Sequence, residues 1–273
     1  MSADVQEPGG EEAALAVPLK PIGKVIAVTS GKGGVGKTFV SANLAAALAK
    51  RGQRVLVLDA DLGLANLDVV LNLYPKITLH DVFTGKAQLE EAILAAPGGF
   101  SVLLAGSGLV EYSRLTPEVR DQLVTIFEAV KPRFDVILID TGAGISDVVL
   151  YAVSMAHEVI VVATPEPTSM TDAYATIKVL SAQQSREQLH LIVNQVNRQG
   201  DGRSICNQLQ QVVERFVQGP TGVSPKLTYL GDIPLDSAVR EAVQKRQLVL
   251  ELHPGCAASQ GVVQIATRLL ARS

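Results

Sequence analysis

The residues with the clearest chemical meaning lie in one glycine-rich run, Gly31-Lys32-Gly33-Gly34-Val35-Gly36-Lys37-Thr38. The run fits the pattern G-x-x-x-x-G-K-[ST], in which glycines let backbone N–H groups approach phosphate oxygens. Lys37 is expected to reach the β and γ phosphates, and the Thr38 hydroxyl is expected to ligate Mg²⁺. A glycine-rich turn that binds no ligand is the alternative interpretation.

The neighbouring segments decide between these interpretations. Residues 25–30 are apolar and predict a buried strand, and residues 39–51 are rich in alanine and predict a helix. The N-terminal end of such a helix adds positive charge where phosphates would lie. The order strand, loop, helix therefore predicts a nucleotide site. Its expected contacts are Gly31, Lys32, Gly33, Gly34, Val35, Gly36, Lys37, Thr38 and Phe39.

Three aspartates lie at or just after the ends of predicted strands and could complete the site. Residues two apart on a strand point the same way, so Asp59 and Asp61 are expected together at the carboxyl edge of the sheet. Either could instead be a turn residue at a strand end. Asp140 follows the apolar residues 136–139, which is the Walker B pattern that contacts Mg²⁺ directly or through water. Residues 141–146 contain two glycines and predict a switch segment that senses the γ phosphate.

Apolar runs and helical stretches alternate along most of the chain. We expect strands at residues 25–30, 55–59, 101–105, 134–140, 158–164, 189–194 and 227–233, and helices at residues 39–51, 117–130, 146–156, 169–183, 203–217, 237–246 and 256–271. This alternation predicts an α/β fold with a doubly wound, mostly parallel sheet and helices on both faces. The acidic residues 1–22, with their prolines and glycines, predict a flexible lead-in to a single domain at residues 23–273.

Composition excludes several classes of protein. The chain has 273 residues, 47% of them hydrophobic, and a net charge of -3, which argues against a broad DNA-binding surface. Cys206 and Cys256 are far apart and form no CxxC pair, so a reducing, cytoplasmic location is expected and a cysteine metal site is not. A signal peptide and a membrane-spanning run are both missing from the sequence.

Lys32 is an addition that an ordinary phosphate loop does not need. The run Lys32-Gly33-Gly34-Val35-Gly36-Lys37-Thr38 resembles the signature of the MinD/ParA family of deviant Walker A ATPases. The resemblance implies a P-loop ATPase that binds ATP or ADP with Mg²⁺ and dimerises around ATP. In that family the first lysine reaches the partner's nucleotide, so little use for Lys32 is expected inside one chain. A solvated loop lysine is the alternative.

The same resemblance assigns roles to further residues. It implies a catalytic set of Lys32, Lys37, Asp61 and Asp140, in which Asp61 orients or activates the attacking water. The metal site would comprise Thr38, Asp61 and Asp140. Asn194 and Pro234 would hold adenine, and Glu166 would lie near the dimer interface and the nucleotide. A strand-end cap, a rigid turn and a helix cap are the respective alternatives for these last three residues.

Residues 59–68, 140–146 and 164–175 make the chain most similar to the FlhG/FleN branch of flagellar-number regulators. The resemblance implies an ATP-dependent dimerisation switch with slow hydrolysis. Its expected partners are a second copy, a flagellar GTPase of the signal-recognition type, a flagellar transcription activator and switch-complex proteins. The GTPase-activating element D-Q-A-x-x-L-R is missing from residues 1–22, which puts that activity in doubt.

Other functions of the same family remain alternatives. One is a MinD/ParA-type ATPase that positions the division site, DNA or other cargo; late basic residues offer a sparse surface for DNA (Arg240, Lys245, Arg246, Arg268 and Arg272). Another is an iron–sulfur assembly ATPase, which the cysteine positions argue against. A third is an adaptor without hydrolysis. Peripheral contact of the last helix with the inner face of the cell membrane is a weaker expectation, because only two arginines flank its apolar face.

Overall fold

The computed structural model describes residues 23–61, 66–106, 115–198 and 200–271. They form an eight-stranded sheet in the order β3-β4-β2-β5-β1-β6-β7-β8. The strands are β1 (Lys24–Ser30), β2 (Val55–Ala60), β3 (Ile93–Ala95), β4 (Ser101–Leu103), β5 (Val136–Ala143), β6 (Glu158–Ala163), β7 (Gln188–Val196) and β8 (Lys226–Pro234). All neighbours pair in parallel except β3 and β4, which pair antiparallel. The expected doubly wound, mostly parallel fold is confirmed.

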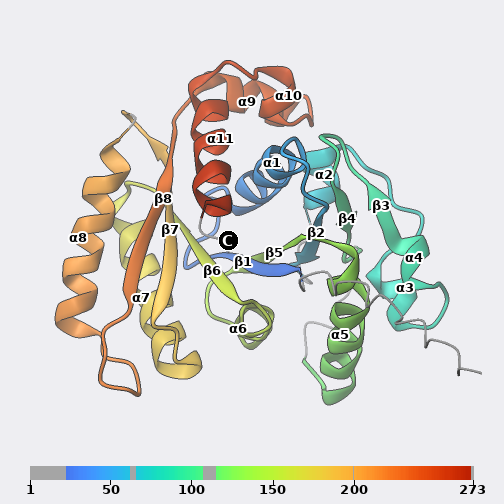
Figure 1. Ribbon diagram of the computed structural model, residues 1–273, viewed down its shortest axis with the longest axis horizontal. Helices are drawn as coiled ribbons and strands as arrows, with labels where there is room; N and C mark the ends of the chain where they lie inside the picture. Colours follow the sequence, from blue (N-terminus) through green and yellow to red (C-terminus); the bar gives the residue numbers. More distant parts are fainter. Residues whose placement is uncertain (1–22, 62–65, 107–114, 199, 272–273) are drawn as a thin grey trace, which may run out of the picture.

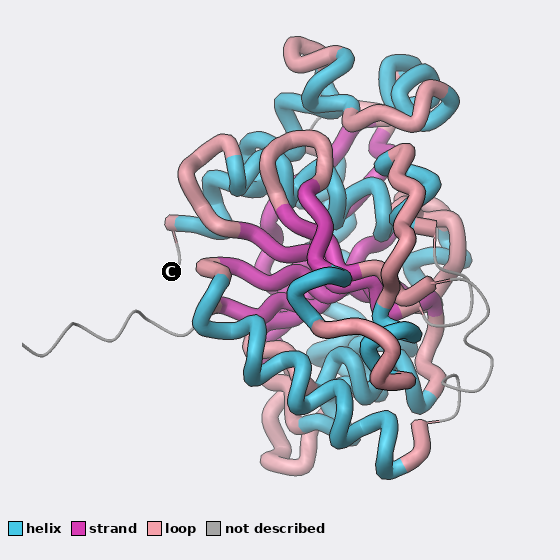
Figure 2. The backbone as a smooth tube through the Cα atoms, turned by 90° about the vertical axis from the view of Figure 1, so that its right-hand side faces the viewer, coloured by secondary structure: helices cyan, strands magenta, loops and turns pink. Residues whose placement is uncertain are grey.

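Helices cover both faces of this sheet. They are α1 (Lys37–Ala49), α2 (Leu67–Leu71), α3 (Leu79–Phe83), α4 (Leu89–Ala92), α5 (Pro117–Val130), α6 (Asp147–Ser154), α7 (Pro167–Gln184), α8 (Asp201–Phe216), α9 (Ser237–Gln244), α10 (Val249–Leu252) and α11 (Ala257–Leu270). Figure 1 shows α1 together with α9, α10 and α11 on one side of the central strands, with α5 and α6 on the other. The turned view in Figure 2 shows the strands running between these helical layers.

Two apolar clusters hold the layers together, one on each face of the sheet. The first joins alternate residues of the strands to α5, α6, α7 and α8, and includes Ile137, Ile139 and Val161. The second joins the intervening residues to α1 and α11, and includes Ile26 and Leu138. Because successive strand residues point to opposite faces, continuous apolar runs supply both clusters.

The sequence prediction and the structure differ in short elements and at some ends. The strand β3 and the helices α2, α3, α4 and α10 were not predicted, and each spans only three to five residues. The strand β5 continues through Ala143, so the first half of the predicted switch segment is strand. The lead-in at residues 1–22 and part of the stretch at residues 59–68 lie outside the described residues.

Candidate nucleotide site

The phosphate loop connects the central strand β1 to α1. Gly34 and Gly36 have φ angles of 78° and 92°, in the left-handed region that glycine tolerates best. A Cβ at Gly36 would also lie 2.4 Å from Nδ2 of Asn194, at the end of β7. A Cβ at Gly31 would lie 2.2 Å from the carbonyl oxygen of Asp172 on α7. The loop therefore needs glycine both for its turn and for its close contacts with neighbouring elements.

A cavity of about 710 Å³ opens in front of this loop. Its wall combines the loop with the ends of β2 and β5 and the start of α6; the residues are Gly33, Gly34, Gly36, Lys37, Thr38, Phe39, Ala60, Asp61, Asn66, Thr141, Gly142, Ala143, Ser146, Val148 and Val149. Backbone amides, a lysine and an aspartate converge there. This phosphate cavity has the size and the donors that a polyphosphate chain requires.

Lys37 occupies the floor of the phosphate cavity and is only 8% exposed. Its ammonium Nζ donates a hydrogen bond to Oγ of Ser30 at 3.0 Å. Burial lowers the pKa of Lys37, while the nearby carboxylates of Asp140 and Asp61 act in the opposite direction. The lysine is thus a desolvated cation that would gain from an anion placed beside it.

Asp140 lies behind the cavity, 3% exposed, and accepts hydrogen bonds from the hydroxyls of Ser41, at 2.9 Å, and Thr38. Burial raises the pKa of Asp140 to about 6, although these hydrogen bonds and Lys37 pull it down. Thr38, Asp61 and Asp140 thus offer one hydroxyl and two carboxylates, the oxygen donors that Mg²⁺ prefers. The residues present fit a Mg²⁺ ion at this place.

Asp59 and Asp61 lie together at the carboxyl end of β2, as expected, but their side chains do not share one cavity. Asp59 does not open into the phosphate cavity with Asp61; it is 1% exposed and borders a separate pocket of about 300 Å³. Its Oδ1 accepts a hydrogen bond from the backbone N–H of Asp61 at 3.1 Å. Burial and the nearby Asp140 raise the pKa of Asp59 well above its usual range. The strand ends between the two aspartates, so the two-residue rule for strands no longer applies.

A second cavity of about 690 Å³ adjoins the first and shares Gly36 and Phe39 with it. Asn194 and Pro234, the residues predicted to hold adenine, both line this base cavity. The Asn194 amide donates to the carbonyl oxygen of Val35 at 2.8 Å and accepts from the backbone N–H of Gln195 at 3.0 Å. One N–H and one lone pair of that amide remain for a ligand.

Lys32 and Glu166 lie outside both cavities and contact each other. The Lys32 ammonium donates to Oε2 of Glu166 at 2.7 Å and to Oγ1 of Thr168 at 2.9 Å. Both contacts are exposed, and the role of Lys32 at a partner's nucleotide stays a prediction. Within one chain the signature lysine thus contacts the start of α7.

Sequence reasoning missed several residues that support the site. The Ser30 hydroxyl accepts a hydrogen bond from the Lys37 ammonium and donates one to the carbonyl oxygen of Lys32 at 2.7 Å. Ser41 lies one helical turn after Lys37, a spacing that could have identified it. Gln195 and Arg240 line the base cavity, but they come from a strand end and from α9, and no motif marked them for that role.

Several residues that the sequence analysis named for DNA binding or iron–sulfur assembly make other contacts in the structure. Lys245 pairs with Glu241 at 2.7 Å, and Arg268 donates to the carbonyl oxygen of Leu230 at 2.8 Å. Cys206 is buried on α8, and Cys256 caps α11. Arg272 lies outside the described residues. Within the ranges that the structure describes, the helices lack the length and apolar character needed to cross a bilayer.

Comparisons with known proteins agree with this geometry. The ParA family model, described as NUBPL iron-transfer P-loop NTPase, matches residues 21–270. The antiactivator FleN of Pseudomonas aeruginosa is 44% identical over 90% of this chain and 86% of its own. The flagellum site-determining protein YlxH of Helicobacter pylori is 37% identical over 91% and 82%. The septum site-determining protein MinD complexed with Mg-ADP from Pyrococcus horikoshii has a TM-score of 0.73 and 30% identity, over 92% of this chain and 98% of that one.

The fold and the phosphate loop thus define a P-loop NTPase. More specifically, the chain belongs to the ParA/MinD family, and within it to the FlhG/FleN branch of flagellar-number regulators.

Proposed function

We propose that this chain is an ATP-dependent dimerisation switch that hydrolyses ATP slowly and regulates flagellar number or placement through partner proteins. The observation that carries the proposal is the convergence of Lys37, Thr38 and Asp61 on one phosphate cavity, with Asp140 hydrogen-bonded behind them. The neighbouring base cavity gives the nucleoside a place next to its phosphates.

The proposed division of roles follows from these positions. Lys37 and the loop amides bind the β and γ phosphates, and Thr38, Asp61 and Asp140 hold Mg²⁺. When bound, Mg²⁺ supplies positive charge that offsets the charge of the phosphate oxygens. Asp61 orients the attacking water, and the Asn194 amide holds the adenine edge.

The proposed dimer requires Lys32 to change partners. Its contacts with Glu166 and Thr168 are exposed, and exposed ion pairs contribute about 0–1 kcal/mol. The phosphates of a second chain's ATP carry more charge than one carboxylate, so they can displace Glu166. In the dimer Lys32 then serves the partner's nucleotide, as an arginine finger does in other NTPases.

Partner proteins are proposed by analogy with the relatives. An antiactivator such as FleN favours a flagellar transcription activator as a target, and a flagellar GTPase or switch-complex protein would suit a site-determining protein such as YlxH. We propose that the chain works in the cytoplasm or at the inner face of the cell membrane.

Substitution of Asp61 tests the switch. Asp61→Ala keeps Lys37 and the loop, so it should bind ATP, remain dimeric in saturating Mg-ATP and lose about 100-fold or more of its ATPase rate. Light scattering and phosphate release measure these properties, with Lys37→Ala as the variant that should not bind ATP. A monomeric Asp61→Ala protein in saturating ATP would contradict the proposed ATP-dependent dimerisation.

Complementation tests the flagellar role separately. The chain, expressed in Pseudomonas aeruginosa that lacks FleN, should restore the parental number of flagella per cell, and Lys37→Ala should not. Electron microscopy provides the count. Unchanged flagellation with a well-expressed, ATP-binding protein would retain the switch and reject the flagellar assignment.

A further inference from the structure

Arg240 is a cation on the wall of the base cavity for which the proposed function has no role. It extends from α9, beside Val239 and Val243, and faces a cavity that Asn194 and Pro234 also line. Its side chain is exposed, and within the described residues its guanidinium has no hydrogen bond, ion pair or ring contact. A free guanidinium at a ligand cavity can bind without first giving up another contact.

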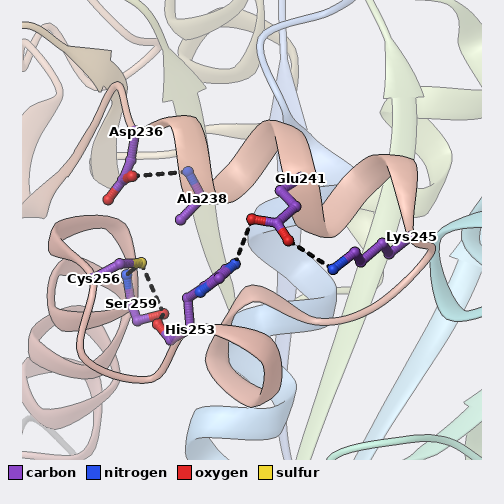
Figure 3. A network of polar contacts seen from close by, with 7 residues as sticks. All are labelled: Asp236, Ala238, Glu241, Lys245, His253, Cys256 and Ser259. Atoms are coloured by element: carbon purple, nitrogen blue, oxygen red, sulfur yellow. Dashed lines mark hydrogen bonds and ion pairs between the residues drawn. The ribbon is translucent and has the colours of Figure 1, made fainter.

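The neighbouring carboxylates, Asp236 and Glu241, bind groups other than Arg240, as Figure 3 shows. Glu241 accepts from Lys245 at 2.7 Å and contacts Nε2 of His253 at 2.9 Å. Asp236 accepts from the backbone N–H of Ala238 at 2.9 Å and caps α11 as well. These contacts fix α9 against the segment before α11 and leave the charge of Arg240 unpaired.

The cavity around Arg240 is suited to a flat, largely apolar ring. Leu235 and Val243 are 67% and 52% exposed, although both are large apolar side chains. The prolyl ring of Pro234 and the side chain of Phe39 complete the apolar surface. The phosphate-binding lysine lines the other cavity, so the phosphates have their own cation.

We propose that Arg240 is a positioning residue that stacks its guanidinium plane on the face of the bound nucleobase. This inference rests on the proposed function, because it requires a nucleotide whose phosphates lie at Lys37. A planar guanidinium packs on an aromatic face and gains from its π electrons. The Asn194 amide then contacts the edge of the base while Arg240 covers its face.

Nucleotide affinities test this role. Arg240→Ala should weaken Mg-ATP and Mg-ADP binding by the same factor, about fivefold, in calorimetric titrations. Mg-tripolyphosphate, which has no base, should bind the variant as it binds the unmodified chain. Arg240→Lys should fall between the two, because an ammonium is not planar. Lys178→Ala removes an exposed cation on α7 and should leave all three affinities unchanged.

The outcomes separate this inference from the proposed function. Unchanged ATP affinity in Arg240→Ala, or a loss that grows from ADP to ATP, would overturn the stacking role and leave the switch intact. Weaker tripolyphosphate binding in that variant would show a general distortion of the site and would also overturn it. Failure of the unmodified chain to bind ATP would overturn both proposals.

Discussion

Three charged side chains at or near the site each have a polar partner within the chain. Lys37 donates to Ser30, Asp140 accepts from Thr38 and Ser41, and Lys32 pairs with Glu166. The contacts of Lys37 and Asp140 restrain side chains that line the phosphate cavity or lie behind it, so binding has less ordering to accomplish there. Binding of ATP would then be mostly an exchange of partners.

Asn194 links the phosphate loop to β7 through its bond to the carbonyl oxygen of Val35. Asn194→Asp replaces that donor with an oxygen, which cannot donate, and leaves the buried carbonyl unpaired. We expect the free energy of unfolding to fall by about 1–3 kcal/mol and ATP binding to weaken. Urea denaturation and calorimetry measure the two effects.

Asn197→Asp makes the same chemical change at an exposed position and should have little effect on stability. Equal stability of Asn194→Asp and Asn197→Asp would show that the Val35 contact does not anchor the loop.

At the scale of single residues, the sequence predicts those site residues that belong to a recognisable motif. Lys37, Thr38, Asp61 and Asp140 have characteristic neighbours, and the structure brings them together. The contacts of Lys32 with Glu166, and of Asn194 with Val35, join residues more than a hundred positions apart. Such contacts depend on how strands are ordered in the sheet, which local pattern does not reveal.

The phosphate loop and α7 touch through backbone atoms as well as through Lys32. A methyl group at Gly31 would collide with the Asp172 carbonyl, whereas one at Gly33 would meet nothing within 4 Å. Gly31→Ala should therefore push the loop away from α7 and destabilise the chain by about 1–3 kcal/mol, and Gly33→Ala should not. Thermal unfolding without nucleotide compares the two; equal melting temperatures would contradict this close packing.

Glu158 ties three neighbouring strands together, because it contacts Lys24 of β1 at 2.6 Å and His190 of β7 at 2.9 Å. Burial alone would raise the pKa of Glu158, but its hydrogen bonds to His190 and Lys24 lower it to about 2. A carboxyl with a depressed pKa stabilises the fold above its ordinary pKa of 4.5 and loses that effect as pH falls towards 2.

Glu158→Gln should therefore cost on the order of 1–2 kcal/mol of unfolding free energy near pH 7, after allowance for solvent screening. The difference from the unmodified chain should shrink steadily between about pH 5 and pH 2. Denaturant titrations across this range measure it, with the exposed Glu128→Gln as control. A difference that is constant with pH would contradict the assigned ion pairs.

At the element scale the long helices and buried strands follow from the sequence. The helix α5 has the predicted bounds, because Thr116 caps it, Pro117 starts it and its apolar face repeats regularly. Short elements such as β3 and α4 contain too few residues to show a period. Their positions depend on packing rather than on local pattern.

At the scale of the whole molecule, the proposed function makes the site of one chain incomplete, because a second chain must supply its Lys32. Both cavities are open, and Lys32 lies outside them on the same chain. Within one chain Lys32 therefore reaches α7, and its proposed use for hydrolysis needs a second copy. Binding of ATP by one chain and association of two chains become separable steps.

The most direct measurement of this central claim is the molar mass by light scattering of Asp61→Ala and of Asp61→Ala combined with Lys32→Ala, both in saturating Mg-ATP. The first variant should have close to twice the 28.8 kDa of one chain, because ATP persists without hydrolysis. The second should bind ATP and remain near 28.8 kDa. Dimerisation of the second variant to the same extent as the first would contradict the role of Lys32 at the partner's nucleotide.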